Sequence, residues 1–178
     1  MKFTKYHKYG AYHWKWYKNP IKYKNYKKHV DKINAWIKED KILDIGCGDG
    51  LITYILGGKG IDNEKMAIKV GKRRGANIEF GDAYSLPFQD EEFDAVFMGD
   101  LLEHLEFPQK AIKEARRVLK KYLYLVVPIH EFSSLVYNHT WTEEKLKNLV
   151  EKQGFVQEEE QERTKTTFPK IYAKFKKI

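Results

Sequence analysis

The chain has 178 residues, of which 42% are hydrophobic and 15% aromatic, a composition that excludes a disordered protein and suits one folded domain. Its single cysteine excludes an intrachain disulfide and a zinc site built on cysteines. The formal net charge of +8 lies wholly in residues 1–40, which hold 11 lysines and 3 acidic residues. The start lacks the apolar core of a signal peptide, and no apolar run reaches the ~20 residues of a membrane helix. We therefore expect a soluble cytoplasmic protein.

Residues 1–40 differ from the rest of the chain and form a basic, aromatic extension. They hold 6 of the 12 tyrosines and 3 of the 4 tryptophans, too many aromatic rings for a solvated tail. Pro20 marks a break, and the residues after it predict a helix over 21–40, with an apolar stripe formed by Tyr26, Val30, Ile33 and Ile37. We expect two parts: a helical extension over 1–40, serving as a lid or cover, and a domain over 41–178.

The stretch 41–50 reads KILDIGCGDG and combines a buried strand with three glycines at alternate positions. An apolar run over 51–56 follows at once and predicts a helix. A strand, a glycine loop and a helix in this order bring backbone N–H groups close to a nucleotide in α/β sheets. Glycine is needed there because a side chain would block the ligand, and because the turn needs backbone angles that other residues avoid.

Strands and helices alternate along the rest of the domain. The sequence predicts strands over 57–62, 77–82, 93–98, 122–127, 155–163 and 170–176, and helices over 63–74, 108–120 and from Thr142 to Gly154. The fold class that we expect is α/β, with a Rossmann-like, doubly wound, mostly parallel sheet of seven strands. The last strand would be antiparallel, and helices would cover both faces to give three α/β/α layers.

Acidic residues stand where the first three strands end. Asp44 and Asp49 flank the glycine loop, Asp62 follows the second strand and Asp82 the third. Ligands of such sheets bind beyond the carboxyl ends of the strands, where Asp62 is spaced to accept hydrogen bonds from ribose hydroxyls. The loop has the spacing G-x-G-x-G rather than the G-x-G-x-x-G of dinucleotide sites, and its acidic neighbours would repel a pyrophosphate. A ligand with a ribose, a positive charge and no phosphate fits better than NAD.

An ordered set of motifs over about 41–155 resembles the class I S-adenosylmethionine-dependent methyltransferases, and most closely their ubiquinone- and menaquinone-biosynthesis-like subgroup, type 11. The motifs are LDIGCGDG at 43–50, IDNEKM at 61–66, GDAYSLPF at 81–88, FDAV at 93–96, GDLLEHL at 99–105 and ARRVLK at 115–120. One departure is a shortening. The Pro-Gly-Gly that usually precedes the fifth strand is missing, and Lys120 and Lys121 run straight into Tyr122.

The resemblance implies a site for S-adenosyl-L-methionine, with S-adenosyl-L-homocysteine as the product. It places the glycine loop under the methionine part, with Asp44 and Asp49 near the ammonium group. Asp62 would accept from the ribose hydroxyls and Asp82 from the adenine amino group, and the backbone N–H of Ala83 would face the ring. The implied cofactor contacts are Asp44, Gly46, Cys47, Gly48, Asp49, Gly50, Asp62, Asn63, Met66, Asp82, Ala83, Gly99, Asp100 and Leu101.

Catalysis would need mainly alignment and exclusion of water, because a sulfonium methyl carbon is already electrophilic. A base matters only for an acceptor that loses a proton, and His104 and His130 are the candidates. The substrate contacts that we expect are Tyr9, Tyr12, Trp14, Trp16, Tyr17 and His130. Two residues also have plain structural readings, Cys47 as a small buried side chain and Trp141 as part of the core.

The function that we expect is methyl transfer to an O, N or C nucleophile of a small molecule. An RNA or protein methyltransferase that uses the basic extension is the alternative, with lysines for phosphate and rings for base stacking. A cofactor-binding regulator without turnover is a remote third reading. The Asn/Asp-Pro-Pro-Tyr motif of base-amino methyltransferases is absent where VPIH occupies 127–130. We expect no metal site and no membrane contact, and a monomer or a homodimer.

Overall fold

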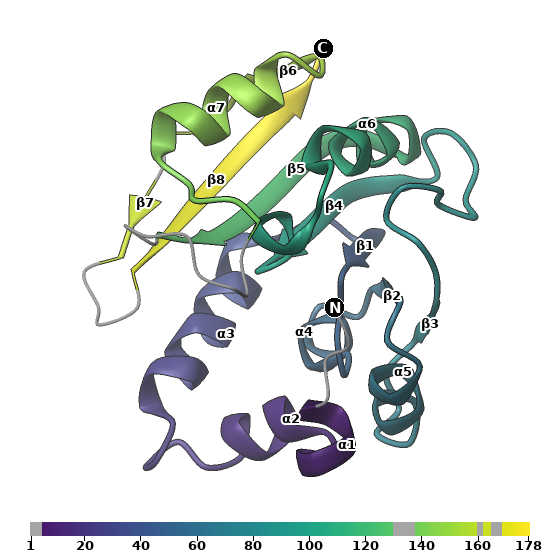
Figure 1. Cartoon of the computed structure of the whole chain (residues 1–178), viewed down its shortest axis with the longest axis vertical. Helices are drawn as coiled ribbons and strands as arrows, with labels where there is room; N and C mark the ends of the chain where they lie inside the picture. The colour runs from purple at the N-terminus through teal and green to yellow at the C-terminus, as the bar shows by residue number, and fades with distance from the viewer. Residues whose placement is uncertain (1–4, 130–137, 160–161, 165–168) are drawn as a thin grey trace. The chain divides into compact units, whose positions relative to one another are not determined.

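The computed structural model describes residues 5–129, 138–159, 162–164 and 169–178 (Figure 1). The chain divides into two compact units, Met1–Asp82 and Ala83–Ile178, and each has its own strands and helices. The N-terminal extension therefore lies in the same unit as the glycine loop. Within the described ranges, every helix is too short or too polar to cross a lipid bilayer.

Three helices form the N-terminal part of the first unit: α1 (Lys5–Tyr9), α2 (Tyr12–Tyr17) and α3 (Lys24–Trp36). The helix predicted over 21–40 is present as α3 but is shorter at both ends. It begins after Tyr23 and ends where Ile37 turns to an extended backbone. Val30 and Ile33 of the predicted stripe are buried, so the apolar face of α3 packs inward as the spacing indicated.

The first unit contains three parallel strands in the order β3-β2-β1. These are β1 (Ile42–Ile45), β2 (Lys59–Asp62) and β3 (Ile78–Phe80), joined through α4 (Leu51–Ile55) and α5 (Lys65–Lys72). The register pairs Ile45 with Ile61 and Asp62 with Phe80. The ends of β1 and β2 therefore meet at one edge, which brings the glycine loop beside Asp62.

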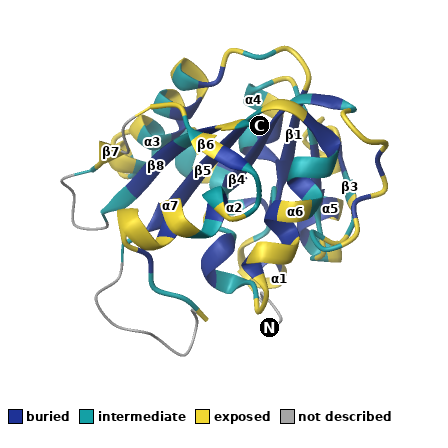
Figure 2. Cartoon of the chain, turned by 90° about the horizontal axis from the view of Figure 1, so that it is seen from above, coloured by how far each residue is buried: buried dark blue, intermediate teal, exposed yellow. Residues whose placement is uncertain are grey.

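The second unit begins with a loop, followed by β4 (Phe93–Gly99), the 3₁₀ turn η1 (Leu102–His104), α6 (Pro108–Val118) and β5 (Leu119–Pro128). Strands β4 and β5 are parallel and largely buried (Figure 2). The fifth strand starts at Leu119, earlier than predicted, because α6 runs into β5 without a loop. A shift in register between Phe93 and Ala95 absorbs the extra residue of β5 in this direct connection.

The C-terminal part contains α7 (Glu143–Glu151), β6 (Phe155–Gln157), β7 (Glu162–Arg163) and β8 (Lys170–Lys177). Thr142 caps α7, and its hydroxyl accepts from the backbone N–H of Lys145 at 3.2 Å. Strand β8 lies antiparallel to β5, which confirms the antiparallel last strand. The prediction of one strand over 155–163 is wrong. Two short strands, β6 and β7, are found there, and they pair with β8 in registers that differ by two residues.

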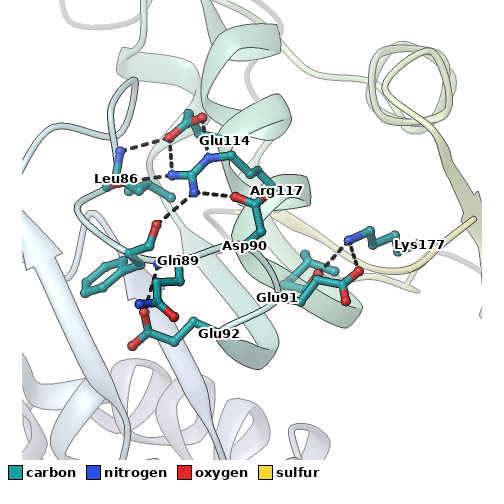
Figure 3. Close-up of polar contacts among 10 residues, drawn as sticks. Leu86, Gln89, Asp90, Glu91, Glu92, Glu114, Arg117 and Lys177 are labelled. Carbon is teal, nitrogen blue, oxygen red and sulfur yellow. Dashed lines mark hydrogen bonds and ion pairs between the residues drawn. The ribbon is translucent and has the colours of Figure 1, made fainter.

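Arg117 of α6 holds the loop that precedes β4, within the second unit (Figure 3). Its guanidinium donates to the carbonyl oxygens of Leu86 at 3.0 Å and Phe88 at 2.8 Å, and to the carboxylates of Asp90 and Glu114. The hydrogen bonds from Arg117 lower the pKa of Glu114. Arg117 of the ARRVLK motif thus has a structural role: it ties α6 to the loop that follows Ala83.

We predict that Gly50→Ala destabilises the protein by ~1–3 kcal/mol, because a Cβ at this position is both strained and crowded. Gly50 has φ = 69°, and its Cβ would lie 2.7 Å from Ala76 Cβ and 2.9 Å from Ile78 Cγ2. Gly57 is the matched control, since it has φ = 65° with no atom within 4 Å of its Cβ. Denaturant unfolding should show a smaller loss for Gly57→Ala; equal losses would contradict the crowding argument.

Candidate functional site

The glycine loop follows β1 as a chain of left-handed turns. Gly46, Gly48 and Gly50 have φ values of 78°, 56° and 69°, which residues other than glycine rarely adopt. The backbone N–H groups of Gly46 and Cys47 both donate to the carbonyl oxygen of Ile61, at 2.9 and 3.0 Å. The loop is thereby held against the end of β2, and the need for glycine that the sequence indicated has a direct structural reason.

Asp62 lies at the end of β2 and binds the loop. One carboxylate oxygen accepts from the N–H of Gly48 and the other from the N–H of Glu64, each at 2.8 Å. Burial raises the pKa of Asp62, while these two backbone hydrogen bonds oppose the rise. Each carboxylate oxygen has a further lone pair, so the held carboxylate can still accept from a ribose hydroxyl. The geometry of Asp62 fits the role that the motif implies.

Asp44 is enclosed within the first unit, at 2% exposure, and accepts from the hydroxyl of Thr53 at 2.6 Å. Burial raises its pKa to about 7. Burial and the nearby Asp44 also raise the pKa of the Cys47 thiol, which makes a thiolate nucleophile at this position unfavourable. The expected contact between Asp44 and an ammonium group stays a prediction.

Asp49 is fully buried and is already bound by the N-terminal extension. Its carboxylate accepts from the backbone N–H of His13 and pairs with His13 Nδ1, both at 3.1 Å. Its carbonyl oxygen accepts from the indole N–H of Trp14 at 2.9 Å. The sequence did not indicate His13, because nothing in its spacing links it to a residue 36 positions later.

The other implied contacts of the first unit lie around the ends of β2 and β3. Asn63 and Asp82 are exposed, and Met66 is half-buried. Glu64 caps α5 by accepting from the N–H of Met66 at 3.0 Å, and the N–H of Gly81 donates to the carbonyl oxygen of Asp62 at 3.1 Å. These bonds fix the backbone on both sides of Asp62. The contacts of Asn63, Met66 and Asp82 with the cofactor stay predictions.

In the second unit, the residues implied at the methionine end lie at the end of β4 and directly after it. Asp100 has φ = 52°, unusual for a residue other than glycine, and its N–H donates to the carbonyl oxygen of Val126 at 2.8 Å. Its carboxylate forms an ion pair with Lys170 of β8. Ala83, Gly99 and Leu101 are half-buried. Their roles toward a cofactor stay predictions.

His104 stands beside a buried carboxylate. Its Nε2 lies 3.9 Å from Oε1 of Glu103, whose side chain is 1% exposed. Burial and the nearby Asp100 raise the pKa of Glu103 to about 8. Among the described residues, nothing hydrogen-bonds to Oε2 of Glu103. His104 was expected as a candidate base, whereas Glu103 was not expected to matter. The adjacent Glu and His of the GDLLEHL motif could have indicated that the two side chains lie together.

The expected substrate residues differ in their surroundings. Tyr9 is 49% exposed, whereas Tyr12, Trp16 and Tyr17 are partly buried. Trp14 is buried in a cluster with Ala11, Val30, Leu51, Ile68, Ala76 and Ile78, so its visible role is packing. His130 lies outside the described residues. Trp141 is buried at 5%, as its structural reading predicted.

Comparisons with known proteins show what this chain is similar to. Residues 43–127 match the family described as "Methyltransferase domain". A demethylmenaquinone methyltransferase of Renibacterium salmoninarum is 38% identical over 111 residues, which cover 58% of this chain and 46% of that protein. An uncharacterised protein of Methanocaldococcus jannaschii is 35% identical over 116 residues, covering 64% of this chain and 55% of that protein. Residues 43–127 of this chain are thus similar to a methyltransferase domain, and the chain spans about half the length of these relatives.

Solved structures share the fold. A possible histamine N-methyltransferase of Thermotoga maritima has a TM-score of 0.72 at 22% identity, covering 93% of this chain and all of that one. The magnesium protoporphyrin IX methyltransferase of Synechocystis, crystallised with bound SAH, has a TM-score of 0.72 at 16% identity, covering 85% of this chain and 83% of that one. The alternating α/β fold, with its mostly parallel sheet and an antiparallel strand, is confirmed by this likeness.

We predict that Asp44→Asn becomes more stable relative to wild type as the pH rises. Burial raises the pKa of folded Asp44 from 3.8 to about 7, so ionisation in this pH window favours the unfolded wild-type chain. The variant does not ionise, so the difference should grow by up to about 1.4 kcal/mol per pH unit.

Chemical unfolding at several pH values measures this difference. The exposed Asp40→Asn is the control and should track wild type throughout. A difference between Asp44→Asn and wild type that does not change with pH would show that Asp44 ionises normally in the folded protein.

Proposed function

We propose that this protein is an S-adenosylmethionine-dependent methyltransferase that methylates an O, N or C nucleophile of a small molecule. The observation that carries the proposal is the pairing of Asp62 with the glycine loop, through the 2.8 Å hydrogen bond from Gly48. A carboxylate held in this way accepts from hydroxyls and repels phosphate, which suits a ribose without a pyrophosphate. The methyltransferase domain over 43–127 and the relatives named as methyltransferases support the same conclusion.

When bound, S-adenosylmethionine supplies an electrophilic methyl carbon on a positively charged sulfur. The residues of this chain then have to bind, orient and exclude water. Asp62 accepts from the ribose hydroxyls, and the glycine loop lets the ligand approach the backbone between Gly46 and Gly50. Asp82 and the N–H of Ala83 recognise the adenine edge. Gly99, Asp100 and Leu101 line the methionine end in this proposal.

For an acceptor that loses a proton, His104 is the candidate base. A histidine can take a proton near neutral pH. The carboxyl of Glu103, 3.9 Å away, can stabilise the resulting imidazolium where it is ionised, which its pKa of about 8 places on the alkaline side of neutral. An acceptor without a proton to lose needs neither group. The effect of His104→Gln on the transfer rate therefore distinguishes the two kinds of acceptor.

A small organic acceptor is favoured over RNA by how the N-terminal rings are used. Tyr6 and Trp14 are buried, and Trp16 stacks on Tyr23 with ring centres 5.4 Å apart. Rings that pack on one another offer little free surface for base stacking. The names of similar proteins point the same way. One relative is a demethylmenaquinone methyltransferase, and one solved structure of the same fold is a magnesium protoporphyrin IX methyltransferase.

We predict that Asp62→Ala weakens the binding of S-adenosylmethionine by ~1–3 kcal/mol, because charged hydrogen bonds to the ribose are lost. Titration calorimetry on the folded variant measures the change. The exposed Asp40→Ala is the control and should bind like wild type. Undiminished affinity in Asp62→Ala would remove this residue from the site.

The acceptor can be found by a transfer screen with cofactor labelled in its methyl group. We expect the label to enter a metabolite fraction of the source cell and not its RNA or protein fractions. Label in RNA that disappears at raised salt would favour the alternative reading, because phosphate contacts weaken with salt. Cofactor binding with no transfer to any fraction would favour a regulator.

A further inference from the structure

The N-terminal extension is hydrogen-bonded to the glycine loop at Asp49. The backbone N–H and the Nδ1 of His13 bind the two carboxylate oxygens of Asp49, and the indole of Trp14 binds its carbonyl oxygen. Because a carboxylate only accepts, the imidazole Nδ1–H is the donor. All three bonds reach the middle of the glycine loop from helix α2, and the Asp49 side chain has no exposed surface.

Tyr6 lies over the same loop. It is on α1 and is buried, at 7% exposure. A Cβ added to Gly48 would overlap the Tyr6 hydroxyl, so this hydroxyl stands directly against the loop backbone. Burial, together with Tyr12 and the carboxylates of Asp49 and Asp62, raises the pKa of Tyr6. Its hydroxyl therefore stays protonated and can donate a hydrogen bond beside the ribose-binding Asp62.

Ring contacts join Tyr6 to the Asp49 attachment. The Tyr6 and Tyr12 rings are 5.0 Å apart, Tyr12 and His13 are 4.1 Å apart, and His13 stacks on Tyr26 of α3 at 5.6 Å. These contacts run from α1 through α2 to α3. A change at His13 should therefore alter the position of Tyr6, although the two residues are seven positions apart.

We propose that Asp49 and His13 form an anchor that holds residues 5–17 over the glycine loop, and that Tyr6, kept in place by this anchor, closes the cofactor site. His13 is then a positioning residue. Asp49 acts through the N-terminal segment, whereas the family resemblance had placed it at the ammonium group of the cofactor. This inference rests on the proposed function, since it assumes that the loop binds S-adenosylmethionine.

Two ligands separate an anchor from an ammonium contact. S-adenosylhomocysteine carries the amino acid group, and 5′-methylthioadenosine lacks it but keeps the adenosine. If Asp49 binds the ammonium directly, Asp49→Asn weakens only the first ligand and His13→Ala weakens neither. If the two residues form an anchor, both substitutions weaken both ligands. The double variant should then bind like each single one, because both remove one interaction.

Titration calorimetry of the full chain with both ligands is the experiment. We expect His13→Ala and Asp49→Asn each to bind both ligands about tenfold more weakly than wild type. His13→Asn should recover part of the loss, since its amide N–H can replace the Nδ1–H. The exposed His7→Ala is the control and should leave both affinities unchanged. Tyr6→Phe, which leaves the anchor intact, should also weaken both ligands.

Each outcome has a definite meaning. Loss of only S-adenosylhomocysteine affinity in Asp49→Asn, with His13→Ala unaffected, would overturn the anchor. Tighter binding by His13→Ala would also overturn it, because the segment would then block the site. If His13→Ala does not fold, wild-type affinity in Tyr6→Phe contradicts the inference. A wild-type protein that binds neither ligand contradicts the proposed function itself.

Discussion

Two backbone N–H groups, those of Gly46 and Cys47, share one acceptor, the carbonyl oxygen of Ile61. This pair of bonds ties the loop after β1 to the end of β2, and the hydrogen bond from Gly48 to Asp62 extends the connection to the carboxylate proposed to bind ribose. The left-handed turns at the glycines make the pairing possible. A side chain at these positions would strain the turn, so the site depends on the absence of side chains as much as on the acids around it.

The acids near the loop have different hydrogen-bond partners, although they stand at similar positions in the sequence pattern. Asp62 is held by backbone N–H groups and can still accept from a ligand. Asp44 is enclosed with Thr53, where its charge is costly, and Asp49 holds the N-terminal segment. Burial raises the pKa of both Asp44 and Glu103, so their ionisation opposes folding as the pH rises toward neutral. The partners of these acids in the folded chain distinguish them from one another, which their spacing in the sequence alone could not do.

Much of this structure could be predicted, because local patterns determine it. The glycine loop, Asp62 and most strands and helices follow from apolar runs and glycine spacing. The anchor could not be predicted, because the bond from His13 to Asp49 depends on how α2 packs after the chain folds. The interruption of the strand predicted over 155–163 was missed for a related reason. Pairing with β8 determines where β6 ends and β7 begins.

Backbone amide chemical shifts recorded during addition of S-adenosylhomocysteine test the central claim, that the glycine loop with Asp62 is the cofactor site. We expect the amides of the glycine loop, from Gly46 to Gly50, and of Glu64 to shift most among those of the first unit. Those of α3, which carries none of the expected cofactor contacts, should change less. Ligand binding that leaves the glycine loop and Glu64 amides unmoved would contradict the account.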